Sequence, residues 1–368
     1  MNEKLVSIVI LNMSGSVLFS PIQIGPLKLK NRIMRSPCVM NDSDNNGFPS
    51  NRLLSYYKEL AIGEMGLITS GGVYATKAGK NCTQMAGIET DQHAEAWRST
   101  IDFIHSKGSK FIFQLADSGE ATTSDISCSQ PRGPSGLLPN SRMMSTAEVE
   151  EFIEIFINAA NRAQNVGSDG VCVHAAHGFM ISEFLSPHYN KRTDKYGGSP
   201  ENNRRILKEI VEGIRSRCGK DFLIATKING ADQCENGITA KDFVQNVLNT
   251  PGLDMVEVSC GFQNDAGCRT PSFKGINGIR FKPGYNLDEA LELRKFSDIP
   301  IAVVGGFRKL KDMEEAVKKG IQLISLGRPS ICELHIVKHL IEGHGSKCIS
   351  CNQCVNALAT GMAKCCVF

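Results

Sequence analysis

The run Gly170-Val-Cys-Val-His-Ala175 is short and almost entirely apolar, and it ends in the loop sequence Ala176-His-Gly178. A continuous apolar run of this length is typical of a strand that is buried on both faces. It follows a helical pattern, Glu148–Val166, which opens with the capping box Ser145-Thr-Ala-Glu148. A helix that leads into a buried strand is one repeat of an alternating α/β fold.

The same alternation extends outward over most of the chain. Seven further apolar runs predict strands at Arg32–Ser36, Gly66–Gly71, Lys110–Ala116, Phe222–Asn229, Met255–Cys260, Pro300–Gly305 and Leu323–Gly327. Helical patterns also lie at Asn202–Ser216, Ala240–Leu248, Leu287–Phe296 and Leu310–Lys319. Eight strand–helix units in roughly 300 residues predict a closed (β/α)8 TIM barrel. No Gly-x-Gly-x-x-Gly follows the first strand, which argues against an open dinucleotide-binding sheet.

Composition narrows the class of protein further. The 368 residues include 41 basic and 38 acidic side chains, which gives a net charge of +3. This balance argues against nucleic acid or a membrane surface as a partner, because proteins that bind either usually carry a basic bias. No apolar run approaches the ~20 residues of a membrane span. The start of the chain lacks the features of a signal peptide, so we expect a cytoplasmic protein with an N-terminal extension over residues 1–16.

Two histidines, His174 and His177, stand where the fourth predicted strand ends. Active sites of TIM barrels lie at the carboxyl ends of the strands, so both imidazoles are predicted to face one pocket. A single histidine at this place would more often be structural. The pair, together with the motifs that follow it, favours a functional site.

Further motifs accompany the histidines in a fixed order. His174-Ala-Ala-His-Gly178 is followed by Phe184-Leu-Ser-Pro187 and by Arg192-Thr-Asp-Lys-Tyr-Gly-Gly-Ser199, and Lys30-Asn-Arg-Ile33 lies near the start. In this order the chain resembles the old yellow enzyme family of FMN-dependent ene-reductases. The resemblance runs from about Val17 to Pro329, which is nearly the whole barrel.

The resemblance implies that FMN binds at the carboxyl end of the barrel. Gly305-Gly306 and Gly327-Arg328 follow the last two strands, where such barrels bind phosphate through backbone N–H groups and arginine. Gln114 matches the glutamine that bonds the flavin pyrimidine, and Lys227 occupies the place of the basic residue beside N1. A lysine within an apolar strand is costly unless an anion pairs with it, and a reduced flavin supplies one. The residues that match the first two strands, where they back onto the ring, are Pro37, Cys38, Val39, Gly71 and Gly72.

The reaction that the resemblance implies is NAD(P)H-dependent reduction of an activated C=C bond. His174 and His177 would bind the carbonyl oxygen of the substrate, which withdraws charge from the β-carbon that receives hydride from flavin N5. NADH or NADPH would then reduce the flavin again. The expected partner is therefore a small-molecule substrate, alongside the nicotinamide cofactor.

Two departures from the family pattern concern the substrate pocket. Phe179 stands where the family commonly has a tyrosine that delivers a proton, so the proton must come from water or another side chain. Asp117 and Glu120 replace two potentially cationic groups after the third strand, which would exclude anionic substrates or favour a cationic one. These departures keep two alternatives open: an amine dehydrogenase or demethylase, and a non-catalytic flavin or metal redox sensor.

A cysteine-rich tail, residues 343–368, follows the predicted barrel of residues 17–342. Cys348, Cys351 and Cys354 are each separated by two residues, and Cys366 follows at a longer gap. Four such thiolates suit a [4Fe–4S] cluster, and the tail resembles that of the dienoyl-CoA reductases and trimethylamine dehydrogenase. Zinc and an unliganded tail are the alternatives, and Cys365 competes with Cys366 as fourth ligand. A cluster would require an electron-transfer partner, and we also expect a homo-oligomer.

Overall fold

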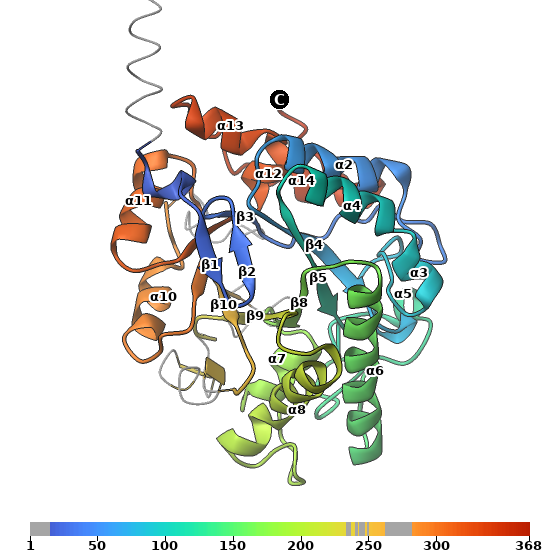
Figure 1. The fold of residues 1–368 in the computed structure, drawn as a ribbon. Helices are drawn as coiled ribbons and strands as arrows, with labels where there is room; N and C mark the ends of the chain where they lie inside the picture. The colour runs from blue at the N-terminus through green and yellow to red at the C-terminus, as the bar shows by residue number, and fades with distance from the viewer. Residues whose placement is uncertain (1–14, 233–236, 240–241, 243–246, 249, 262–281) are drawn as a thin grey trace, which may run out of the picture.

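Eight parallel strands form a closed barrel that is surrounded by helices (Figure 1). The computed structural model describes residues 15–232, 237–239, 242, 247–248, 250–261 and 282–368. The barrel strands are β3 (Ile33–Arg35), β4 (Leu67–Tyr74), β5 (Lys110–Ala116), β8 (Gly170–Ala175), β9 (Leu223–Asn229), β10 (Met255–Ser259), β11 (Ile301–Val304) and β12 (Leu323–Leu326). The TIM barrel and each of the predicted strands are therefore confirmed, with small shifts at the strand ends.

The longer helices cover the outside of the barrel and pack their apolar faces against the strands. They are α2 (Asn51–Ile62), α4 (Arg98–Ser106), α6 (Thr146–Asn165), α8 (Pro200–Cys218), α10 (Leu287–Arg294) and α11 (Leu310–Lys318). The predicted capping box is present at α6, where Ser145 Oγ accepts from the N–H of Glu148 and Glu148 accepts from the N–H of Ser145. The predicted helix at Ala240–Leu248 lies largely outside the described residues.

Shorter elements occupy the loops between these strands and helices. They are the helices α3 (Asp91–Glu95), α5 (Ser124–Ser127), α7 (Met180–Leu185), α12 (Arg328–Cys332), α13 (Ile336–Ile341) and α14 (Gln353–Asn356), the 3-10 turns η1 (Val17–Phe19), η2 (Lys77–Gly79) and η6 (Ala357–Thr360), and the strands β6 (Arg132–Gly133) and β7 (Arg142–Met143). Some of them contribute to the hydrophobic core, such as α7 with Phe184 and α13 with Leu340.

An antiparallel hairpin of β1 (Ile22–Ile24) and β2 (Leu27–Leu29) closes the amino-terminal end of the barrel. In Figure 1 it lies in blue across that end. The hairpin packs Ile24, Leu27 and Leu29 against inward-facing side chains at the bottom of the barrel, such as Met34 and Leu67. This hairpin is not predicted from the sequence, because strands of three residues are too short to show a pattern. Because the hairpin covers the amino-terminal end of the barrel, we expect a binding site at the carboxyl ends of the strands.

The C-terminal tail packs beside the loop that follows the first barrel strand. The N–H of Ala363 donates to the carbonyl of Met40 at 2.9 Å, and Asn41 Nδ2 donates to the carbonyl of Leu358 at 3.0 Å. Figure 1 shows α12 and α13 beside α2, where Tyr56 Oη of α2 donates to the carbonyl of Ser330 in α12. The tail therefore approaches the carboxyl end of the barrel, where the predicted site lies.

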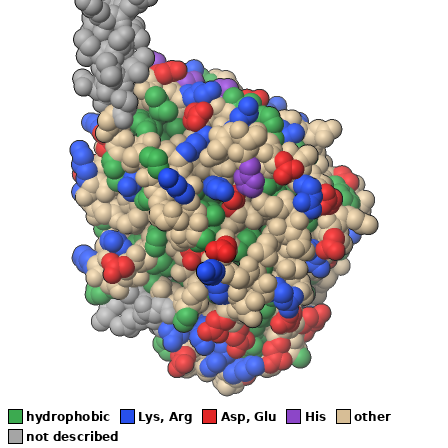
Figure 2. All heavy atoms as spheres, in the orientation of Figure 1, with side chains coloured by type: hydrophobic (Ala, Val, Ile, Leu, Met, Phe, Trp, Pro, Cys, Tyr) green, Lys and Arg blue, Asp and Glu red, His purple; other side chains and the backbone are tan. Residues whose placement is uncertain are grey.

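The surface agrees with the nearly balanced charge of the sequence. Figure 2 shows basic and acidic side chains interspersed over the described residues of one face of the molecule. In the described part of the chain, no helix combines the length and the apolar composition that crossing a membrane requires.

Candidate active site

A cavity of about 320 Å³ opens at the carboxyl ends of the eight barrel strands. This volume is within the range of sites for small ligands and cofactors. The predicted site residues that line it are Pro37, Cys38, Val39, Gly72, Gln114, His174, His177, Phe179, Lys227, Gly305, Gly306, Gly327 and Arg328. Gly71 instead lines a small neighbouring cavity. The fold thus brings together side chains that lie almost 300 positions apart in the sequence, from Pro37 to Arg328.

His174 lies in β8, where the strand register pairs it with Lys227 of β9. Its Nδ1 accepts a hydrogen bond from the N–H of Ala176 at 3.2 Å, so the neutral ring carries its proton on Nε2. Burial, reinforced by the charge of Lys227, lowers the pKa of His174 to about 3. His174 therefore presents an N–H donor to a ligand while the ring stays uncharged near pH 7.

His177 lies in the loop after β8, with its ring centroid 5.2 Å from that of His174. Its Nε2 is 2.8 Å from Ser259 Oγ, and its backbone N–H donates to Asn229 Oδ1 at 3.2 Å. Burial and the neighbouring His174 lower its pKa well below the usual value. Ser259 also lines the cavity, but the sequence gives no signal for it because its partner His177 lies 82 positions away.

Gln114 and Lys227 form a polar end of the cavity that suits the pyrimidine ring of a flavin. Gln114 Nε2 is buried, and it has no hydrogen-bond partner within the described residues. A buried amide N–H group without an acceptor is costly, and a carbonyl oxygen of a ligand would satisfy it. Lys227 Nζ donates to Ser36 Oγ at 3.0 Å and lies 3.4 Å from Glu257 Oε1. This end therefore offers an unsatisfied amide and a buried cation.

Glycines form another part of the cavity wall, and this glycine wall suits a phosphate group. Gly306 has a φ of +70°, and a Cβ atom there would lie 2.2 Å from the carbonyl oxygen of Lys282. At Gly327 a Cβ atom would lie 3.2 Å from Cys38 Sγ. Glycine is thus required at Gly306 and keeps the backbone accessible at both positions. Arg328 follows directly and lines the cavity, and its Nη1 donates to Asn352 Oδ1 of the tail at 2.7 Å. The residues present therefore fit both the pyrimidine ring and the phosphate group of FMN.

Asp117 was predicted to contact a substrate, but it does not line the cavity. Its Oδ1 accepts from the N–H of Gly119 at 2.9 Å, and its Oδ2 lies 3.6 Å from Arg132 Nη2. Burial raises its pKa. Glu120, the second acidic replacement, accepts from the N–H groups of Gly136 and Leu138 at 2.7 and 2.8 Å. Both acids bind the backbone of loops near the cavity, so in this structure they organise these loops instead of facing a ligand.

The tail cysteines gather around a second, smaller cavity. Its wall includes Cys348, Cys351, Cys354, Cys365 and Cys366, and also Cys332 from the end of α12. Cys332 and Cys365 are hydrogen-bonded, and burial together with the Cys365 thiol raises the pKa of Cys332. No group of three or more metal-binding side chains in a geometry that could hold an ion is found within the described ranges. The predicted cluster or zinc ion therefore stays a prediction.

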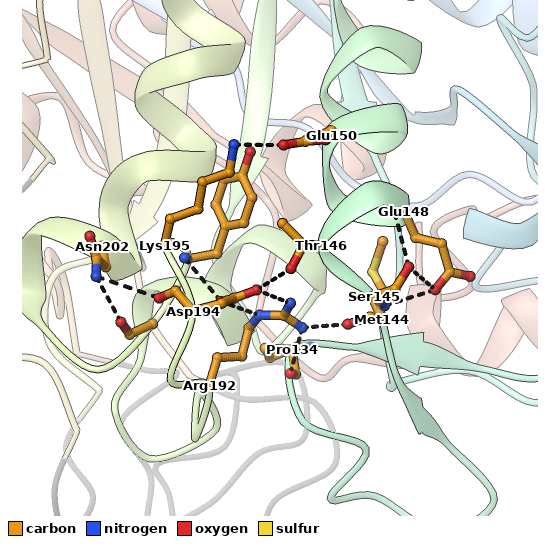
Figure 3. A network of polar contacts seen from close by, with 12 residues as sticks. Pro134, Met144, Ser145, Thr146, Glu148, Glu150, Arg192, Asp194, Lys195 and Asn202 are labelled. Atoms are coloured by element: carbon orange, nitrogen blue, oxygen red, sulfur yellow. Dashed lines mark hydrogen bonds and ion pairs between the residues drawn. The ribbon is translucent and has the colours of Figure 1, made fainter.

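The diagnostic motif Arg192–Ser199 lies outside the cavity. The guanidinium of Arg192 donates to both carboxylate oxygens of Asp194, and to the carbonyls of Pro134 and Met144 at 3.2 and 2.5 Å (Figure 3). Asp194 also accepts from Thr146 Oγ1 at 2.6 Å, and these donors lower its pKa. The network joins the loop after α7 to the segment that precedes α6 and to the first residue of α6. It therefore fixes the chain around the site without entering the site.

Comparisons with known proteins agree with this geometry. The family model for the NADH:flavin oxidoreductase / NADH oxidase family matches residues 17–345. The chain is 32% identical over 350 residues to an NADH oxidase of Thermoanaerobacter brockii, a match that covers 91% of this chain and 52% of that protein. The chain therefore spans about half the length of this relative. It is also 32% identical over 319 residues to an NADPH dehydrogenase of Geobacillus sp. (strain WCH70), which covers 85% of this chain and 90% of that protein.

A solved structure of 2-naphthoyl-CoA reductase in complex with 2-naphthoyl-CoA matches with a TM-score of 0.87 and 28% identity. This match covers 95% of this chain and 56% of that protein. The resemblance to the old yellow enzyme family is confirmed by these matches, and the reaction type of the family is flavin-dependent oxidoreduction with NADH or NADPH. The chain belongs to the NADH:flavin oxidoreductase / NADH oxidase family.

Proposed function

We propose that the protein uses FMN and NADH or NADPH to reduce a carbon–carbon double bond that is conjugated to a carbonyl group. One observation supports this most strongly: His174 and His177 line the same cavity as Gln114, Lys227 and the glycine wall. A substrate carbonyl held by the histidines would therefore share one cavity with the cofactor.

In this proposal FMN supplies the hydride that the β-carbon of the substrate accepts. His174 donates its Nε2–H to the carbonyl oxygen, and the hydrogen bond strengthens as negative charge develops there. Because its pKa is lowered to about 3, the ring acts as a neutral donor over the whole range near neutral pH. Ser259 holds the ring of His177 in place, and Phe179, which carries no proton, leaves proton delivery to water or another side chain.

A conjugated acyl thioester is one substrate of this class, and the similarity to 2-naphthoyl-CoA reductase supports testing it. Its thioester carbonyl would take the same place between the histidines as the carbonyl of an enone. The placement of Asp117 outside the cavity removes the carboxylate that had favoured a cationic substrate. An amine dehydrogenase or demethylase therefore stays the second candidate.

For the tail we propose a [4Fe–4S] cluster held by Cys348, Cys351, Cys354 and either Cys365 or Cys366, with zinc as the alternative. The gathering of these cysteines around one small cavity supports this proposal. Cys354 lines both that cavity and the main one, so a cluster there would lie beside the proposed flavin site. Such a cluster would pass electrons to or from a partner protein.

Absorption spectroscopy on anaerobically purified protein tests the cofactors. We expect flavin bands after supply of FMN, bleaching on addition of NADH or NADPH, and an iron–sulfur absorption with matching iron content. Turnover is then measured with 2-cyclohexenone and with a cinnamoyl thioester. Failure to bind FMN would overturn the proposed function. Reduction of the flavin by amines but not by NADH or NADPH would favour the amine dehydrogenase, and flavin binding without any turnover would favour the redox sensor.

A further inference from the structure

A carboxylate lies directly behind the polar end of the cavity. Glu257 sits in the middle of β10, and 1% of its side chain is exposed. It does not line the cavity itself, but its three polar neighbours Ser36, Lys227 and Ser325 do. The register of β9 and β10 pairs Glu257 with Lys227, so both side chains enter the barrel at the same level.

Ser36, Ser325 and Lys227 all contact the same oxygen of Glu257, Oε1. Ser36 Oγ and Ser325 Oγ each donate to Oε1 at 2.6 Å, and Lys227 Nζ lies 3.4 Å from the same atom. Lys227 also donates to Ser36 Oγ at 3.0 Å. The other oxygen, Oε2, is buried and has no hydrogen-bond partner in the described part of the chain. The hydroxyl protons of both serines are therefore committed to Glu257, whereas the ammonium group keeps N–H groups for a ligand.

The titratable groups around this pair are uncharged near neutral pH. Cys172, on the neighbouring strand β8, has a pKa raised by burial and by Glu257. His174 and His177 have pKa values lowered by burial. Lys227 and Glu257 form the ion pair of this end, and opposite charges act strongly on each other in a site with little water.

We propose that Glu257 is a positioning residue that cancels the charge of Lys227 beside the pyrimidine end of the cofactor. The proposal rests on the proposed function, with the pyrimidine ring of FMN expected beside Gln114 and Lys227. A lone lysine there would stabilise the negative charge that a reduced flavin carries on its N1–C2=O edge. With Glu257 opposite, the site is neutral overall, so the flavin is a stronger reductant than lysine alone would make it.

Sulfite is a direct probe of this charge, and it requires no turnover. Its sulfur forms a bond to N5 of an oxidised flavin with its own electron pair, which leaves negative charge on the N1–C2=O edge. A more positive site therefore binds sulfite more tightly. Glu257→Gln keeps the shape of the side chain but leaves Lys227 uncompensated, so we expect sulfite to bind about tenfold more tightly. The same tenfold change in equilibrium corresponds to a rise of about 30 mV in the two-electron midpoint potential.

Four proteins complete the design: wild type, Glu257→Gln, Lys227→Gln and the double variant. The net charge of the pair is zero, +1, −1 and zero respectively. Sulfite affinity should therefore be highest in Glu257→Gln, similar in wild type and the double variant, and lowest in Lys227→Gln. Glu120→Gln is the matched control, because Glu120 is also buried but lies outside the cavity; it should leave sulfite affinity unchanged.

The outcomes separate the two proposals. FMN affinity of the wild type is measured first by fluorescence quenching, and absence of binding would overturn the proposed function itself. If FMN binds but Glu257→Gln changes only thermal stability, Glu257 is structural and this inference is wrong. If Glu257→Gln fails to fold, the comparison of Lys227→Gln with the double variant still measures the carboxylate. Removal of the Glu257 carboxylate from the Lys227→Gln protein should tighten sulfite binding, and an unchanged sulfite affinity would overturn the inference.

Discussion

Two motifs that stand close together in the sequence have different tasks in the structure. His174–Gly178 places two imidazoles in the wall of the cavity, whereas Arg192–Ser199 lies outside it and ties loops together. Arg192 donates to a carboxylate and two carbonyls, so its donors are used within the protein. His174 accepts at Nδ1 and keeps Nε2–H for a ligand. Arg192 thus has a structural role, because the protein itself accepts its hydrogen bonds. His174 belongs to the candidate site, because its Nε2–H is left for a ligand.

The largest effect is expected from breaking the structural motif. Arg192→Ala should lower the free energy of unfolding by about 3–5 kcal/mol, because it leaves Asp194 and two carbonyls without their buried partner. Urea unfolding measures this loss. Lys195→Ala, which removes an exposed ion pair of the same loop, should leave the melting temperature unchanged. A similar loss of stability in both variants would show that the buried Arg192 contributes no more than an exposed ion pair.

Removing the His174 side chain from the cavity should lower activity and leave stability nearly unchanged, which is the reverse of the effect expected for Arg192→Ala. His174→Ala is expected to lower kcat/KM for an enone by about 10²–10³-fold, since the developing negative charge loses one hydrogen bond. FMN affinity and melting temperature should change little, because the side chain contributes one local hydrogen bond. Steady-state kinetics at saturating NADPH provide the measurement. A loss below about fivefold would show that His174 does not bind the reacting carbonyl.

The low pKa values of the histidines predict a dependence of stability on pH. The pKa of His174 is about 3 in the folded protein, against 6.5 for an unperturbed histidine. As pH falls below about 6.5 the unfolded chain takes up this proton and the folded chain does not, so stability is lost at about 1.4 kcal/mol per pH unit. Urea unfolding at about pH 7, 6 and 5 should therefore give a shallower slope for His174→Gln than for wild type. Equal slopes would mean that His174 is not buried in its neutral form.

The smallest effect is expected at Phe179, whose ring centroid lies 5.0 Å from that of His174 in the same cavity. If water supplies the proton to the α-carbon, Phe179→Tyr adds a second route and should change kcat by less than about fivefold. Stopped-flow oxidation of the reduced enzyme by an enone isolates this step. A much larger gain would show that proton delivery limits the wild-type protein.

The sequence was most informative where the signal is local. The strands Lys110–Ala116 and Gly170–Ala175 were predicted to the residue, because a barrel strand buried on both faces is a continuous apolar run. The capping box before α6 was also predicted, since its partners lie within four residues. The histidine pair could be found from the sequence because His174 and His177 are only three positions apart. The motif at Arg192 showed the family but gave no indication that its role is structural.

The sequence by itself determined the barrel, the family and the side chains offered at each strand end. Only the tertiary structure decided which of these side chains meet: Ser259 with His177, Glu257 with Lys227, and Cys332 with the tail. It also paired Asp117 with Gly119 and Arg132, so that this side chain is not part of the cavity wall. The physical reason is that a closed parallel barrel sets neighbouring strands side by side in register, so contacts form between residues that are tens to hundreds of positions apart. No local pattern of hydrophobicity or spacing encodes such a contact.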